Sequence, residues 1–191
     1  MQHLDVIFYH LRKKLKLRLC DNYRYTTINC FFKTYIDKTY SRYYPADQTY
    51  QISTQEDYEK SYVVAKNEDA ITNIINRFCI SAGLPWHMID EVYVPVNRGK
   101  EFHWVLVVIV LKERVIRVYD LLSSKIKKKS PNKIQKLAVM LPAYLSDSHF
   151  FKKTKRTDWS TLKAYKGKLG QQTDLIIQNL FDVEYVQNIP Q

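Results

Sequence analysis

The stretch that decides the fold is EFHWVLVVIVLKERVIRVYD, residues 101–120. Both halves are rich in Val and Ile, which strands favour, and the charged segment LKER between them marks a turn. A Val/Ile content this high is typical of strands that are covered on both faces of a sheet. Residues 101–120 therefore predict an antiparallel hairpin inside a sheet.

The open end of this hairpin brings two ionisable side chains together. His103 and Asp120 are 17 residues apart, with their midpoint between Leu111 and Lys112. Residues equidistant from a turn face each other in an antiparallel pair, so the two are expected opposite one another or a few positions off. A carboxylate beside an imidazole fixes its tautomer and stabilises its protonated form. The pair is a candidate catalytic dyad, although a His and an Asp at strand ends are more often ordinary surface or turn residues.

The segments on either side of the hairpin have mixed character. Apolar residues spaced by three and four predict helices over residues 3–19, 27–40, 67–79 and 131–141. The polar, tyrosine-rich segment 41–66 is expected to be a loop. The order of helices, strands, helix and strand is typical of an α+β fold.

Three short segments complete the pattern. A β-branched stretch predicts a strand at residues 91–96, where Pro95 indicates an edge strand or a strand end. A last strand is predicted at 183–186. A short helix is expected over 157–168, capped by Thr157 or Asp158.

Composition limits the class of protein. The 191 residues suit one domain, and 46% hydrophobic residues argue against disorder. The longest apolar run, Trp104–Leu111, is far too short to span a membrane. No secretory signal is visible at the N-terminus, and the three cysteines have no CxxC spacing. We expect a soluble intracellular chain, nuclear or cytoplasmic, with no disulfide framework and no membrane partner.

The positive charge is concentrated in one segment. The formal net charge is +11, and residues 122–168 hold 13 Lys and Arg against Asp147 and Asp158. Such a field suits an acidic partner, either a nucleic acid or the acidic surface of another protein. Solvated lysine-rich loops that bind nothing specific are the alternative. A nucleic-acid partner rests on charge alone, because the sequence has no zinc finger and no RNP-type aromatic motif.

Longer motifs carry a resemblance to a known family. The centre of the chain, VYVPVNRGKEFHWVLVVIVLKERVIRVYDLLSS (92–124), joins a Pro-containing strand, a His-Trp pair and an Asp followed by Leu and Ser. This segment resembles the ubiquitin-like-protein-specific proteases, also called SUMO or sentrin proteases. The segments RTDWS (156–160), VEYVQNIPQ (183–191) and DVIFYHLRKK (5–14) are similar to the plant branch. The resemblance implies a papain-like cysteine protease fold of α+β class.

The resemblance also implies roles for three residues and a class of substrate. His103 would be the general base that activates a cysteine thiol, and Asp120 would orient and stabilise it. Trp104 would wall a narrow channel for the Gly-Gly tail of a SUMO-like modifier; a buried core aromatic is the alternative. The partner would be such a modifier or its conjugates, and no metal or cofactor is expected.

The chain departs from the family at its end. The family's nucleophile lies in an Asp-Cys-Gly segment that follows a Gln-Gln pair, and this sequence stops at Gln191, a candidate for the oxyanion glutamine. The three cysteines, Cys20, Cys30 and Cys79, precede His103, which is the wrong order for the family. Residues 1–191 are therefore expected to be a single catalytic domain whose C-terminal part, with the nucleophile, is missing. The alternative is a catalytically dead fragment that acts as a modifier-binding or basic interaction module.

Overall fold

A computed structural model describes residues 24–43, 55–77, 84–97, 104–120, 132–153, 156–166 and 180–186. The strands are β1 (Tyr25–Thr27), β2 (Glu91–Asn97), β3 (Trp104–Val110), β4 (Val115–Tyr119) and β5 (Asp182–Val186). The helices are α2 (Phe31–Tyr43), α3 (Gln55–Asn76) and α4 (Asn132–Asp147). Three single turns of 3-10 helix are η1 (Trp86–Met88), η3 (Phe150–Lys152) and η4 (Trp159–Thr161).

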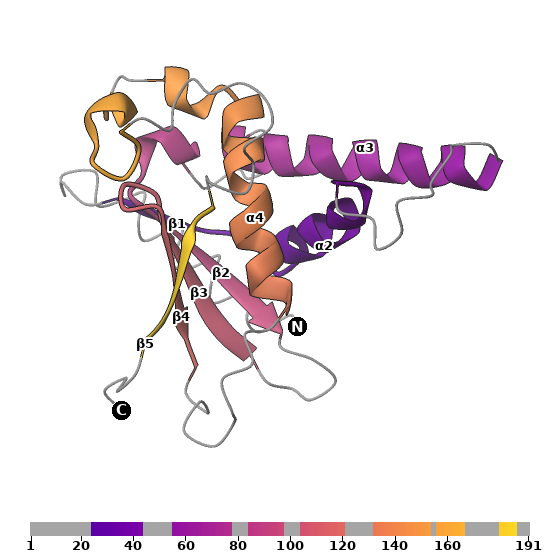
Figure 1. The fold of residues 1–191 in the computed structure, drawn as a ribbon, viewed down its shortest axis with the longest axis horizontal. Coiled ribbons are helices and arrows are strands. Elements are labelled where there is room, and N and C mark those ends of the chain that lie inside the picture. The colour runs from indigo at the N-terminus through magenta and orange to yellow at the C-terminus, as the bar shows by residue number, and fades with distance from the viewer. Residues whose placement is uncertain are drawn as a thin grey trace.

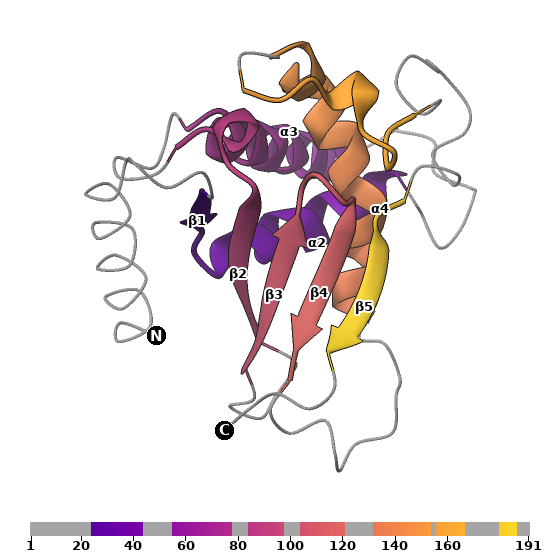
Figure 2. The ribbon, with the colours of Figure 1, turned by 90° about the vertical axis from the view of Figure 1, so that its left-hand side faces the viewer.

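The five strands form one mixed sheet in the order β1-β2-β3-β4-β5 (Figure 2). The two inner pairings, β2 with β3 and β3 with β4, are antiparallel, whereas β1 and β5 join the edges in parallel. The hairpin predicted from the sequence is β3 and β4, and Val110 pairs with Val115 beside the turn. The α+β fold class is thereby confirmed.

The helices lie together on one side of the sheet (Figure 1). Alternate residues of the central strands face them, because side chains point to opposite faces along a strand. The core contains, from the three central strands, Val92, Val94, Val96, Val105, Val107, Ile109, Ile116 and Val118. Helix α4 contributes Ile134, Leu137, Ala138 and Leu141 at helical spacing. The other face of the sheet carries half-buried polar and aromatic side chains, such as Tyr93, Arg117 and Tyr119.

Helix α4 continues past its predicted end. It runs to Asp147 with Pro142 inside it, whereas the apolar pattern predicted an end at residue 141. A proline inside a helix removes one backbone donor. Tyr144 and Leu145, 3% and 0% exposed, pack into the core beyond it. Tertiary packing therefore outweighs the local preference.

Several other predicted boundaries were wrong. Helix α3 begins at Gln55, so the predicted loop 41–66 is helical in its second half. Its Glu, Gln, Lys and Ala residues favour a helix even without an apolar stripe. Helix α2 begins at Phe31, not at residue 27, because Tyr25–Thr27 pair with β2 as a short parallel strand.

The remaining differences concern short elements. The helix predicted over 157–168 is only the turn η4, and Asp158 caps it by accepting from the Ser160 backbone N–H. Strand β2 is internal rather than an edge, but β1 pairs only as far as Tyr93. Pro95 lies beyond the last residue of β2 that pairs with β1, so the backbone N–H that proline lacks is not needed for this pairing. The helix predicted over residues 3–19 lies outside the described residues.

Candidate active site

One end of the sheet gathers the predicted site residues that the structure describes. There β2 ends and β3 begins, with Asn97 paired to Trp104. Strand β4 ends at the same edge, where Tyr119 pairs with Leu106 and Asp120 follows. Asp120 is only 4% exposed, and Trp104 is half-buried. A buried carboxylate thus sits at the edge where the strand following His103 begins.

The observed register lies within the range expected from the sequence. The pairing of Val110 with Val115 puts the centre of the turn between Lys112 and Glu113, inside the predicted LKER turn. Extending this register by one step places Asp120 level with Val105. Because side chains two residues apart on a strand share a face, Asp120 is also on the same face of the sheet as Ile116 and Val118, which belong to the core. The burial of Asp120 agrees with this placement.

The other predicted site residues are mostly outside the described part of the chain. His103 and Gln191 lie there, as do Cys20 and Cys79, so the contact between His103 and Asp120 stays a prediction. Cys30 is described; it lies half-buried between β1 and α2 and forms no disulfide.

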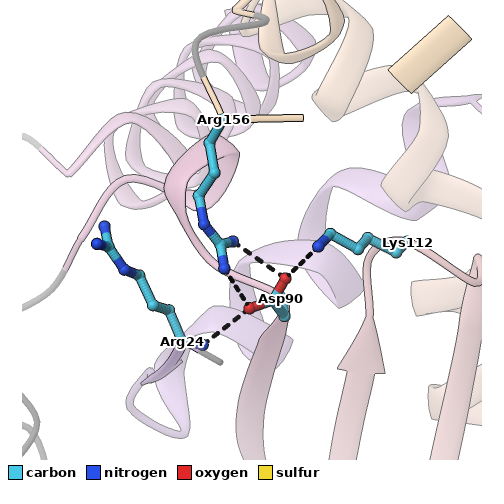
Figure 3. A network of polar contacts seen from close by, with 4 residues as sticks. All are labelled: Arg24, Asp90, Lys112 and Arg156. Atoms are coloured by element: carbon cyan, nitrogen blue, oxygen red, sulfur yellow. Dashed lines mark hydrogen bonds and ion pairs between the residues drawn. The ribbon is translucent and has the colours of Figure 1, made fainter. Parts of the chain in front are cut away.

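The opposite end of the sheet holds a network that sequence reasoning missed. The carboxylate of Asp90, just before β2, accepts hydrogen bonds at 3.0 and 2.7 Å from the two terminal nitrogens of Arg156 (Figure 3). The ammonium of Lys112, in the turn between β3 and β4, lies 2.8 Å from the same carboxylate. The backbone N–H of Arg24 donates to it at 2.8 Å, while the Arg24 side chain points away. Asp90 therefore joins four segments that are far apart in the sequence.

This network sets the charge state of Asp90. Burial raises the pKa of the carboxyl, but the hydrogen bonds from Arg156, Lys112 and the Arg24 backbone oppose burial and hold the pKa below its usual value. Asp90 is ionised near neutral pH as a result. Its one negative charge faces two positive side chains, so the cluster keeps a net positive charge.

A second cluster fastens β5 to the same end of the sheet. The guanidinium of Arg114 lies 5.2 Å from the ring centre of Tyr165 and 5.4 Å from that of Phe181. It also donates to the Leu180 carbonyl at 3.2 Å, and the Asp182 backbone N–H donates to the Arg114 carbonyl at 3.0 Å. Burial lowers the pKa of Arg114, while Tyr165 and Asp182 oppose that shift. Cation–π contacts of this kind are strongest where water is excluded.

These elements define an α+β domain, and a comparison with known families assigns its class. The sequence model described as "Ulp1 protease family, C-terminal catalytic domain" matches residues 7–191. The chain belongs to this family.

Solved structures give a weaker comparison. Three chains match, all of the SUMO protease Ulp1, with the catalytic cysteine oxidised to a sulfenic, sulfonic or sulfinic acid. The sulfenic acid structure is 15% identical, with a TM-score of 0.33, over 84% of this chain. The sulfonic acid structure is 16% identical, with a TM-score of 0.28, over the same share. The alignment spans 56% of each solved chain. No curated protein matches the sequence.

Two further features are absent from the part of the chain that the structure describes. None of the described helices combines the length and the apolar character needed to cross a membrane. Within the same residues, no three His, Cys, Asp or Glu side chains are grouped so that they would hold a metal ion.

Proposed function

We propose that the chain is part of a cysteine peptidase that hydrolyses the bond after the Gly-Gly tail of a SUMO-like modifier. The family match supports the class of reaction, and the buried Asp120 supports the location of the site. The Asp120 carboxylate follows β4 at the edge of the sheet where β3 begins. Strand β3 begins at Trp104, the residue after His103. In a nuclear or cytoplasmic protein this activity would process modifier precursors or release modifiers from conjugates.

Strand periodicity adds support for the dyad. His103 precedes Val105 by two residues and therefore has the same position in the two-residue period as Val105 and Val107. Asp120 has the same position in the period as Val118, which pairs with Val107. If β3 continues one residue toward its N-terminus, the imidazole and the carboxylate belong to the same face of the sheet.

The proposed mechanism assigns one task to each residue. The His103 imidazole takes the proton of a cysteine thiol, and the thiolate attacks the carbonyl carbon of the terminal glycine. The imidazolium gives that proton to the leaving amine as the C–N bond breaks, which leaves an acyl-enzyme. Water, deprotonated by His103, then hydrolyses the thioester. Asp120 holds the imidazole tautomer and stabilises its charge, and Trp104 walls the channel for the glycines.

The nucleophile is proposed to lie beyond residue 191 in the full protein. The three cysteines of the sequence all precede His103, and the match to the family model extends to Gln191. Gln191 is proposed as the donor to the oxyanion. The position of all three cysteines before His103 also favours a second candidate, a non-catalytic module that keeps the modifier-binding surface.

Cleavage of a modifier–peptide fusion tests the proposal. The protein extended through the segment that follows Gln191 should cleave a SUMO-like fusion after Gly-Gly. His103→Ala should lower kcat/KM about 10²- to 10⁴-fold, as expected for loss of a general base. Asp120→Asn should lower kcat with a smaller effect on KM, because the carboxylate contacts His103 and not the substrate. Modifier binding without cleavage by the extended protein would favour the non-catalytic module.

A further inference from the structure

One pole of the domain carries a cluster of cations that the proposed chemistry does not use. We define the basic pole as Lys152, Lys153, Arg156, Lys163 and Lys166, which lie in and around η3 and η4. Among the described residues from Ser148 to Lys166 the only carboxylate is Asp158, and it is engaged by the Ser160 backbone and hydroxyl.

The four lysines of the basic pole have no carboxylate partner within the described residues. Lys152, Lys163 and Lys166 are exposed. Lys153 donates to the side-chain oxygen of Asn76 at 2.6 Å and to the Ser148 carbonyl at 3.2 Å, and both acceptors are uncharged. No described carboxylate therefore neutralises the charge of these four lysines, whereas Arg156 is paired with Asp90.

Buried aromatic rings give this pole a fixed shape. Phe150, Trp159 and Tyr165 are at most 1% exposed, and the ring centres of Phe150 and Trp159 are 4.4 Å apart. The Tyr165 hydroxyl donates to the Leu111 carbonyl at 2.5 Å, which ties the segment to the sheet. The rings of Phe151 and Tyr165 are 5.4 Å apart. Lys152 and Lys166 are the exposed neighbours in sequence of these two rings, so the backbone that carries them is held in place before any partner binds, which lowers the entropic cost of binding.

The basic pole lies far from the candidate catalytic edge. The bonds from Arg156 to Asp90 and from Tyr165 to Leu111 place it at the end of the sheet where β2 begins and β3 ends (Figure 2). Trp104 and Asp120 lie at the other end. The seven residues of β3 separate the two ends by roughly 20 Å. A partner on the basic pole would leave the catalytic edge open.

The chemistry of the pole favours an acidic polypeptide over a nucleic acid. Proteins that bind single strands stack bases on exposed aromatic rings, and here the rings of Phe150, Trp159 and Tyr165 are buried. Arginine forks are the common two-point contacts to phosphates, and the fork of Arg156 is already engaged by Asp90. The exposed groups are lysine ammoniums, compact point charges that pair with single anionic oxygens and need no planar two-point acceptor.

We propose that the basic pole is a docking surface for an Asp/Glu-rich segment of a partner protein. Binding of this kind is carried by charge and weakens as salt screens it. The inference does not depend on the proposed peptidase activity, since it uses residues at the opposite end of the sheet.

A charge-reversal pair tests the docking surface in the full-length protein. The variant is Lys152→Glu with Lys166→Glu, and the matched control is Lys38→Glu with Lys66→Glu, at exposed positions of α2 and α3. The probes are a fluorescein-labelled oligoglutamate peptide and a labelled DNA duplex, followed by fluorescence anisotropy at low and physiological ionic strength. The wild type should bind the peptide with salt-dependent affinity. The pole variant should lose at least about tenfold in affinity and the control less than about threefold.

Three results would overturn the inference. Equal losses in both variants would mean that only net charge matters, and no loss in the pole variant would exclude the surface. Tighter binding of the duplex, abolished by the pole variant, would make nucleic acid the partner instead. Lys152→Gln with Lys166→Gln removes the same charges without reversal and replaces the first variant if that one does not fold. Cleavage of a modifier fusion should be unchanged in the pole variant, which separates this test from that of the proposed function.

Discussion

Replacement of Asp90 by Asn should strongly destabilise the domain, although Asn has nearly the same shape. The side chain of Asp90 is 8% exposed and that of Arg156 is 17% exposed. Asn keeps an oxygen acceptor for the Arg24 N–H but leaves the Arg156 charge without its carboxylate. Breaking a buried ion pair from one side costs about 3–5 kcal/mol. Lys112 adds little, because its side chain is 41% exposed.

This loss is large on the scale of domain stability. Small domains unfold with a free energy of about 5–15 kcal/mol. For a typical urea dependence, a loss of about 3 kcal/mol shifts the unfolding midpoint by roughly 1.5 M. Urea unfolding of the full-length protein, followed by circular dichroism, measures the shift. Asp158→Asn is the matched control, because that exposed carboxylate lies in the same segment and its replacement should cost less than about 1 kcal/mol.

The pH dependence gives a second test of the same network. The folded pKa of Asp90 lies below its unfolded value, so its contribution to stability is full above the unfolded pKa of about 3.9. That contribution is lost as the pH falls through the folded pKa. The difference in stability between wild type and Asp90→Asn should therefore shrink in acid. The reasoning would be refuted if the unfolding free energy of Asp90→Asn at neutral pH were within about 1 kcal/mol of the wild-type value. Zero coupling energy between Asp90→Asn and Arg156→Gln in a double-mutant cycle would also refute it.

Two further substitutions probe how the basic pole and β5 are held. Arg114→Ala removes the cation over Tyr165 and Phe181 and the bond to the Leu180 carbonyl, and should cost about 2–4 kcal/mol. In a hydrogen-exchange measurement, the Asp182 N–H, which donates to the Arg114 backbone carbonyl, should exchange faster with solvent because β5 is held less firmly. Unchanged protection of this N–H would contradict the role of the Arg114 side chain in holding β5. Trp159→Ala should cost about 3–5 kcal/mol in a thermal or urea melt, because the indole is fully buried against Phe150 and Tyr165. A loss below about 1 kcal/mol would mean that the aromatic cluster does not fix the pole.

The hairpin was predictable because its signal is local. Val and Ile dominate β3 and β4, and the charged tetrapeptide LKER separates them, so residue types alone predicted both strands and the position of the turn. The family resemblance rests on the same stretch. Strand β1 was missed because three residues carry no period, and they form a strand only through parallel pairing with β2.

The Asp90 network was beyond sequence reasoning for a different reason. Its members come from positions 24, 90, 112 and 156, and no spacing along the chain connects them. Only the fold of the sheet and the return of the segment after α4 bring them together. The basic pole was predictable only in part for the same reason. Its excess of positive charge is visible in the sequence, but the packing of the buried aromatic rings beneath it is not.

The catalytic dyad is the central claim, and a covalent probe tests it most directly. A SUMO-like modifier ending in an electrophile in place of its last carboxylate should react only with an activated thiolate at the end of the proposed Gly-Gly channel. Peptide mass spectrometry of the extended protein should find the adduct on a cysteine after residue 191, and His103→Ala should suppress it. Residues 1–191 alone should form no adduct on Cys20, Cys30 or Cys79. Modification of one of these three cysteines, or full labelling of the His103→Ala protein, would contradict the account.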